Sequence, residues 1–174
     1  MFHLKKSLLG VAALAAIASA PSAFAVPGVD IGIMGGANYA MPSNSAGITK
    51  KIGLGGGASI GVGPLEISAI YNQYKIEASG LTVTTNYLDI PVLLRIGAGP
   101  ISLGLGGFYS PFLSGTTNVG GTVTADANYG ATGSLRFTVP VAGFFIDGRY
   151  NLGLNDDGGS KLSGASVYLG WNIL

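Results

Sequence analysis

Ionisable side chains recur at alternate positions in several segments that the sequence pattern predicts to be β-strands. Asp89 and Arg95 share a parity within 85–97, and Asp147 and Arg149 share one within 141–152. Because successive side chains of a strand point to opposite faces, we expect these groups on one face, where buried charges must be paired. The predicted network of Arg–carboxylate pairs comprises Asp30, Glu66, Asp89, Arg95, Arg136, Asp147 and Arg149.

Two kinds of chemistry fit such a network. The functional interpretation is a selectivity filter or a proton path. The structural interpretation is a plug of ion pairs, which we favour because eight strands enclose a space just wide enough for side chains. Asp89 and Arg95 are separated by about 20 Å along their strand at 3.3 Å per residue. Each of them therefore needs a partner on a neighbouring strand.

Catalytic and metal-binding chemistry finds little support in the remaining residues. The chain has no cysteine, and its single histidine is His3. Those two residue types supply most nucleophilic and zinc chemistry. The run Gly53–Ala58 loosely matches a dinucleotide-binding fingerprint, but the following Ser59–Pro64 cannot form the helix that this motif requires. We expect no enzymatic activity, no cofactor and no metal.

The first 25 residues have the features of a secretory signal peptide. Lys5 and Lys6 precede an apolar stretch from Leu8 to Ala18, and Ala23-Phe24-Ala25 forms an A-x-A cleavage site. The expected organisation is a signal peptide over 1–25 and one domain over 26–174. Loss of two lysines leaves seven basic and eight acidic residues, a balance that offers no attraction for nucleic acid.

The composition argues against an ordinary water-soluble protein. Only 10% of the residues are charged, while 48% are apolar and 30 residues are glycine. A typical soluble domain carries roughly 25% charged residues. Disorder is also disfavoured, since it requires low hydrophobicity and high charge.

Alternating segments separated by turn residues predict eight strands. Short connections at Gly63-Pro64, Gly99-Pro100 and Val139-Pro140 alternate with longer ones. This asymmetry is typical of an eight-stranded antiparallel up-and-down transmembrane β-barrel. The predicted strands are 29–39, 52–62, 65–76, 85–97, 101–112, 128–138, 141–152 and 163–174, and the predicted long loops are 40–51, 77–84, 113–127 and 153–162.

The apolar face of these strands is expected to meet lipid. The opposite face carries mostly Gly, Ser, Thr and Asn with one or two charges per strand, which suits a narrow interior better than a solvated surface. Aromatic residues near the strand ends predict two interfacial belts. The belt at the long-loop side comprises Tyr39, Tyr71, Tyr109, Tyr129 and Tyr150, and the opposite belt contains Phe137 and Trp171.

Six inward positions are glycine, so the sequence is compatible with a wide or a narrow interior. Strands 29–39 and 52–62 place Gly32, Gly36, Gly53, Gly55, Gly57 and Gly61 inward. A thin water path remains along this wall unless large inward groups on other strands fill it. The candidates for filling are Tyr74, Tyr87, Phe108, Phe145 and Tyr168.

The segment Tyr87–Arg95, Y-L-D-I-P-V-L-L-R, resembles a motif of the PorT-like outer membrane β-barrel family. The closing Tyr168-Leu169-Gly170-Trp171 is also similar to that family. The resemblance implies an outer-membrane barrel of mostly undefined function and transfers no catalytic residues. Barrels of this kind usually end in an aromatic residue that the assembly machinery recognises, whereas this chain ends in Leu174. Within the motif, Pro91 removes a ladder donor, so we expect a β-bulge there.

These observations favour a small integral protein of the bacterial outer membrane with a structural or surface-interaction role through its long loops. Its expected partners are outer-membrane lipid and the barrel assembly machinery. Two alternatives stay open. One is a narrow pore or small-ligand conduit along the glycine-lined wall, and the other is a secreted soluble barrel that binds a hydrophobic ligand inside.

Overall fold

The computed structural model describes residues 28–43, 47–155 and 160–173. The predicted signal peptide over 1–25 lies outside these residues. The described chain is all-β and antiparallel. Its strands are β1 (Val29–Pro42), β2 (Ile48–Val62), β3 (Leu65–Ala78), β4 (Leu81–Ala98), β5 (Ile101–Ser110), β6 (Phe112–Thr117), β7 (Asn128–Thr138), β8 (Phe144–Gly153) and β9 (Leu162–Asn172).

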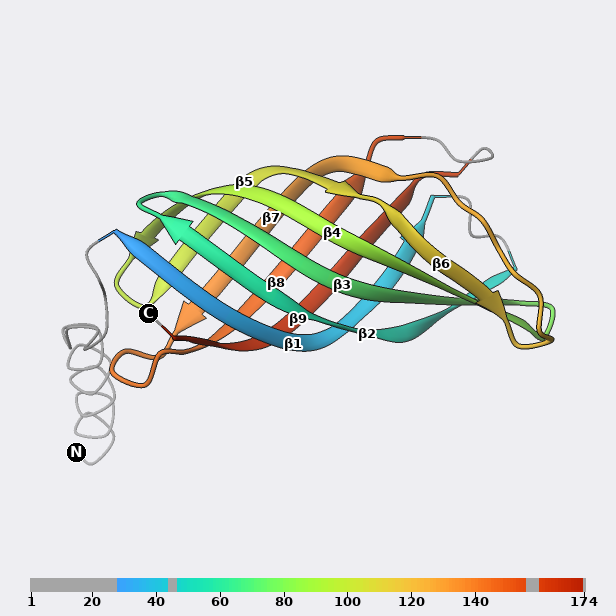
Figure 1. The fold of residues 1–174 in the computed structure, drawn as a ribbon, viewed down its shortest axis with the longest axis horizontal. Coiled ribbons are helices and arrows are strands. Elements are labelled where there is room, and N and C mark those ends of the chain that lie inside the picture. The colour runs from blue at the N-terminus through green and yellow to red at the C-terminus, as the bar shows by residue number, and fades with distance from the viewer. Residues whose placement is uncertain (1–27, 44–46, 156–159, 174) are drawn as a thin grey trace, which may run out of the picture.

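Eight of these strands close into a ring, as the sequence predicts. Each pairs with its neighbour along the chain, except that β5 pairs with β7, and β1 pairs with β9 to complete the circuit. Figure 1 shows the tilted strands wound around one axis, with the short turns and the C-terminus at one end. Within the described residues, no helix is long and apolar enough to cross a membrane.

The distribution of polar and apolar side chains is the reverse of that in a water-soluble protein. Ile96 and Leu105 are 79% and 71% exposed on the outside of the ring, whereas Asp147, pointing inward, is 0% exposed. In a water-soluble protein, large aliphatic groups are buried and charges are exposed. The predicted assignment of faces is confirmed: apolar side chains point outward and polar side chains point inward.

The predicted strand 101–112 is divided at Pro111. The chain turns away from β7 at this proline, which has no backbone N–H for a ladder, and continues as β6 beside the first half of β4. The segment after β6 folds back, and the Val123 amide donates to the Gly115 carbonyl at 3.0 Å. The first parts of β2 and β4, the last part of β3 and β6 therefore form a sheet that continues beyond the ring (Figure 1), here called the extended sheet.

Three further predicted connections differ from the structure. The loop predicted over 40–51 is shorter, because β1 extends to Pro42 and β2 begins at Ile48. The loop predicted over 77–84 is a two-residue turn, since Ser79 and Gly80 both have positive φ, 50° and 80°. This conformation matches the twist of a β-hairpin and lets both strands extend. Conversely, the turn predicted at Val139-Pro140 runs to Gly143, so β8 begins at Phe144 rather than at residue 141.

The bulge expected at Pro91 is absent. Ile67 lies opposite Val92 and Ile70 lies opposite Asp89, so β3 and β4 keep one register on both sides of the proline. In an antiparallel pair, each residue directs its N–H toward one neighbouring strand only. The missing donor at Pro91 therefore removes a ladder bond without inserting a residue.

The inward glycines permit neighbouring strands to approach closely. A Cβ atom at Gly57 would lie 2.0 Å from the Ala69 carbonyl oxygen, and one at Gly36 would lie 2.0 Å from that of Val167. Neighbouring backbone thus occupies the space that a side chain would need. These positions require glycine because of packing, and they do not form an empty wall.

Replacement of Gly57 by alanine should destabilise the ring by about 3 kcal/mol or more, at the upper end of overpacking costs, because the clash is with backbone. Gly35→Ala is the matched control, since its Cβ would meet nothing closer than 3.9 Å. Urea unfolding of both variants in lipid vesicles measures the difference. Equal stability of the two variants would contradict this account of the glycines.

Candidate functional site

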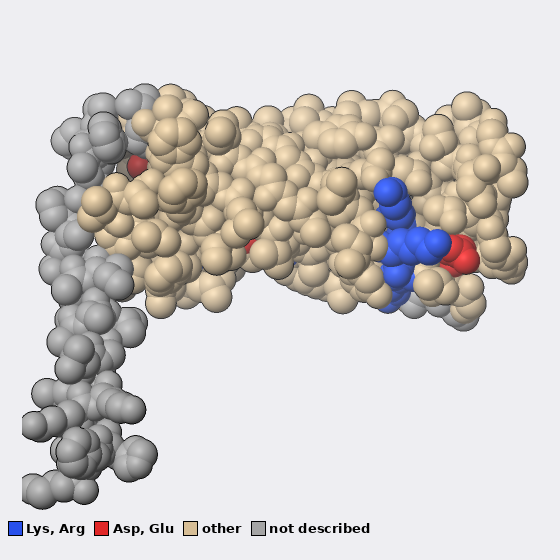
Figure 2. Space-filling model, turned by 90° about the horizontal axis from the view of Figure 1, so that it is seen from below, with Lys and Arg blue, Asp and Glu red and all other residues tan. Residues whose placement is uncertain are grey.

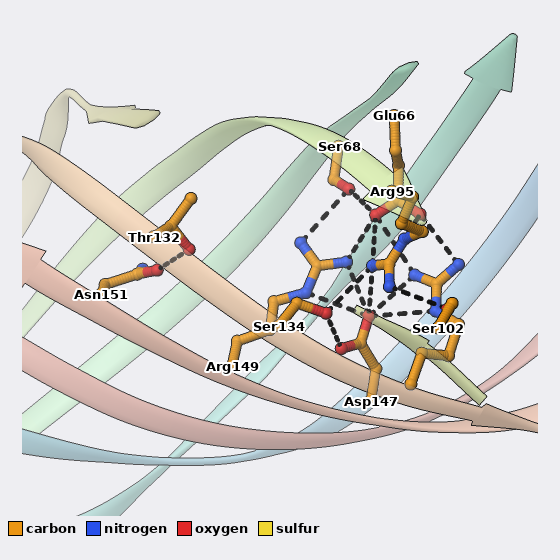
Figure 3. Close-up of polar contacts among 10 residues, drawn as sticks. Glu66, Ser68, Arg95, Ser102, Thr132, Ser134, Asp147, Arg149 and Asn151 are labelled. Carbon is orange, nitrogen blue, oxygen red and sulfur yellow. Dashed lines mark hydrogen bonds and ion pairs between the residues drawn. The ribbon is translucent and has the colours of Figure 1, made fainter. Parts of the chain in front are cut away.

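Five inward side chains meet inside the ring and form what we call the arginine–carboxylate cluster. Glu66 comes from β3, Arg95 from β4, Arg136 from β7, and Asp147 and Arg149 from β8. Register brings them together, since Arg136 and Asp147 are direct cross-strand partners. Figure 3 shows Glu66 and Asp147 on opposite sides of the guanidinium groups.

Glu66 accepts from all three arginines. The Arg95 Nε and Nη2 atoms lie 2.7 and 3.0 Å from its two carboxylate oxygens, a bidentate arrangement. The Arg136 Nη1 lies 2.8 Å from Oε2, and the Arg149 Nη2 lies 2.9 Å from Oε1. Charge-assisted bonds of this geometry are the strong ones in proteins.

Asp147 is bound by the same three arginines. Its Oδ2 lies 3.1 Å from the Arg95 Nη2, 2.8 Å from the Arg136 Nη2 and 3.0 Å from the Arg149 Nη2. The Ser134 hydroxyl donates to Oδ1 at 2.5 Å. Each carboxylate therefore contacts three cations, and the cluster joins four strands across the ring.

Aromatic rings pack against two of the guanidinium groups. The Arg136 Cζ lies 4.2 Å from the centroid of Phe145, and the Arg149 Cζ lies 5.9 Å from that of Tyr168. Both rings are buried, as are the other three side chains proposed to fill the interior, Tyr74, Tyr87 and Phe108. These contacts fix the arginines by stacking as well as by ion pairs.

Asp89 lies apart from the arginine–carboxylate cluster. Its Oδ2 accepts from the Asn72 amide at 2.7 Å, the Tyr74 hydroxyl at 3.1 Å and the Asn151 amide at 3.2 Å. Asn72 in turn accepts from Tyr168 at 2.8 Å. As expected, Asp89 does not meet Arg95, but its partners are neutral groups rather than an arginine.

Asp30 does not join the network, contrary to the sequence prediction. Its parity is inward, but it is the second residue of β1, beside the end of the ring, and its side chain is exposed. Among the described residues it makes no ion pair. Parity alone gives the face of a side chain and not its depth, which explains the error.

A group of aromatic side chains covers the interior at the long-loop end. Tyr87 packs edge-to-face against Tyr74 at 6.0 Å and against Phe112 at 5.6 Å, measured between ring centroids. Ala40 completes the buried group. Sequence reasoning did not single out Phe112, although it shares the inward parity of Phe108 and Ser110 within the predicted strand 101–112.

The aromatic residues predicted for the two belts all lie on the outside of the ring and are exposed. Tyr109 and Tyr129 are direct cross-strand partners. At the short-turn end, Phe144 stacks on Trp171 with ring centroids 6.2 Å apart, and its outward parity was the signal by which it could have been included. The full predicted set is Tyr39, Tyr71, Tyr109, Tyr129, Tyr150, Phe137 and Trp171.

The chemistry available to the interior is the chemistry of ion pairing. In the part of the chain that the structure describes, no group of acidic, histidine or cysteine side chains could hold a metal ion. The carboxylates of Glu66 and Asp147 are occupied by arginine donors, and the Asp89 Oδ2 is occupied by amide and hydroxyl donors. The geometry therefore supports a structural role, in which the arginine–carboxylate cluster cross-links the strands from inside the ring.

Comparison with family models finds no match, and comparison with curated proteins finds none. The similarity to the PorT-like family therefore rests on the motif alone. The chain resembles the crystal structure of Neisserial surface protein A (NspA), with a TM-score of 0.63 and 17% identity over 84% of this chain and 99% of that one. At this identity, the likeness supports the fold, an antiparallel ring of eight strands.

Removal of one charge from the arginine–carboxylate cluster should be costly. Asp147→Asn leaves three buried arginines with one carboxylate, so we expect a loss of about 3–5 kcal/mol in the free energy of unfolding. Asp30→Asn serves as the control and should change it by less than about 0.5 kcal/mol, because Asp30 is exposed. Urea titration in lipid vesicles gives both values. A similar small effect for both variants would exclude a structural role for the cluster.

Proposed function

We propose that this protein is an integral β-barrel of the bacterial outer membrane, with a structural or surface-interaction role and a lumen closed by its own side chains. Export by the predicted signal peptide and insertion by the barrel assembly machinery belong to this proposal. The observation that carries it is the outward apolar face of the ring, which only a lipid environment can cover over its full circumference.

The outward face changes character at one level of the extended sheet. On β4, the outward residues Leu88 to Ile96 are apolar, whereas Asn86, Thr84 and Thr82 are polar. Tyr71, the cross-strand partner of Leu88, marks this level and donates to the Asn86 amide oxygen at 2.7 Å. A membrane boundary at Tyr71, with the extended sheet in water, fits this change.

The alternative of a soluble barrel with a hydrophobic ligand inside disagrees with the orientation of the side chains. Such a barrel needs an apolar interior and a charged exterior. Here the interior holds Glu66, Asp147 and their three arginines, and the exterior holds leucine, isoleucine and valine.

A conduit is the second candidate, and the glycine-rich wall was its basis. Neighbouring backbone occupies the space beside Gly36 and Gly57, and Tyr74, Tyr87 and Phe112 cover the long-loop end. We therefore expect no steady unitary current from the purified protein in a planar bilayer. A reproducible current that Asp147→Asn alters would favour the conduit.

A surface role is consistent with the polar extended sheet, which presents threonine, serine and asparagine beyond the ring. The motif around Asp89 and Pro91 also favours the PorT-like group of barrels, whose functions are mostly undefined. No histidine or cysteine follows His3, so we expect no catalysis.

Cell fractionation combined with a heat-modifiability gel tests the proposed location. We expect the protein in the outer-membrane fraction, with a mobility on the gel that changes when the detergent-extracted sample is boiled. The shift arises because a closed barrel stays folded in detergent until it is heated. Recovery from the periplasm or medium, with no shift, would refute the proposal.

A further inference from the structure

Two lysines face each other on the outside of the extended sheet. Lys51 on β2 and Lys75 on β3 are cross-strand partners, so their side chains lie on the same face with Cβ atoms about 5 Å apart. The register shifts between Lys51 and Gly55, and this irregularity turns Lys51 to the side on which Lys75 lies.

This pair lies just beyond the apolar surface. Lys75 follows Tyr71 by four residues, about 13 Å along the strand, which becomes about 10 Å along the membrane normal for a tilted strand. Figure 2 shows blue side chains gathered at one place toward the end that carries the extended sheet, with an acidic side chain in red beside them, on a face that carries almost no other charge. At that height, a barrel side chain meets lipid headgroups.

The surroundings of the pair are polar and rich in hydroxyl groups. Thr84 is the cross-strand partner of Lys75 on β4, and Thr116 on β6 is the partner of Thr84. Nearer Tyr71, the Asn86 amide donates to the Ser114 hydroxyl at 2.9 Å. Hydroxyl and amide groups of this kind suit the sugars and phosphates of a glycolipid headgroup.

The local charge is only partly balanced. Glu77 forms an ion pair with Lys51, and this contact holds the pKa of the Glu77 carboxyl below its usual range. Among the described residues, Lys75 makes no ion pair. Two lysines and one glutamate leave one net positive charge at this place. Because like charges directly opposite each other destabilise a sheet, an external anion bound here would relieve the repulsion.

Protection of a strand edge does not explain both lysines. β2 loses its pairing with β1 above Ile52, and lysine on an exposed edge prevents pairing with another chain. That argument applies to Lys51. Lys75 lies on β3, which is paired with β2 on one side and β4 on the other.

We propose that Lys51 and Lys75 bind the phosphate of a phosphorylated glycolipid in the outer leaflet, with the threonine-rich face of the extended sheet against its sugars. This inference rests on the proposed outer-membrane location. The apolar face below Tyr71 would contact the acyl chains of the same lipid, so one molecule would span both surfaces.

The test measures binding of bisphosphorylated lipid A to the full-length mature barrel in zwitterionic detergent by native mass spectrometry. Lys51→Gln/Lys75→Gln should weaken binding about 25-fold, since each lysine near a charged lipid surface contributes about fivefold. Dephosphorylated lipid A should bind the wild type as weakly as bisphosphorylated lipid A binds the double variant. The charge-retaining Lys51→Arg/Lys75→Arg variant should restore binding.

The matched control is Lys50→Gln, which removes a neighbouring charge from the opposite face, where Lys50 pairs with Ile76. It should leave binding unchanged. The proposal fails if the double glutamine variant binds as tightly as the wild type, or if Lys50→Gln weakens binding equally. It also fails if inorganic phosphate or a soluble acidic polysaccharide binds through these lysines as tightly as the lipid does.

A heat-modifiability gel on every variant separates this inference from the location proposal. A wild-type protein that shows no shift would count against the barrel in the membrane. A folded wild-type barrel with no preference for the phosphorylated lipid would count against the lysine site alone.

Discussion

Backbone hydrogen bonding within a closed ring is the constraint on which this structure depends. Lipid offers no partner to an N–H or C=O group, so a sheet can span a bilayer only if its first and last strands pair. The pairing of β1 with β9 over Gly32 to Pro42 provides that closure. Once the ring is closed, one face of every strand points into the interior and the other points outward. The alternation of polar and apolar side chains follows from that difference in surroundings.

The narrow interior sets the next requirement. At Gly36 and Gly57 the backbone of a neighbouring strand occupies the place of a Cβ atom, and aromatic rings and ion pairs are buried in the interior. Glu66 and Asp147 each contact three arginines, so every charged group of the cluster has partners of opposite sign. A buried pair of this kind is weak evidence for net stability, but breaking it is strongly unfavourable. The arginine–carboxylate cluster thus defines one arrangement of strands more than it adds to their stability.

Alternation in the sequence was sufficient to predict the ring, the two faces and all five members of the arginine–carboxylate cluster, because parity is a local property. Depth and loop geometry are not local. Asp30 has the inward parity and still lies exposed, and the continuation of the chain beyond Pro111 as β6 beside β4 was not predicted. The Ser79-Gly80 turn was not predicted, because polar residues in 77–84 are equally typical of a loop and of a hairpin with polar strands. Pro91 was expected to bulge, yet its missing donor is accommodated in an unchanged register.

The central claim is that the outward face of the ring contacts lipid. Because the chain has no cysteine, single cysteines can carry spin labels at Ser166, Val167 and Leu169 on β9 and at Thr116 on β6, in protein reconstituted in vesicles. The account predicts that labels at Val167 and Leu169 collide with oxygen and not with a water-soluble nickel complex. The label at Thr116 should collide with the nickel complex, and the inward label at Ser166 should be shielded from both reagents. Ready access of the nickel complex to Val167 and Leu169 would contradict the account.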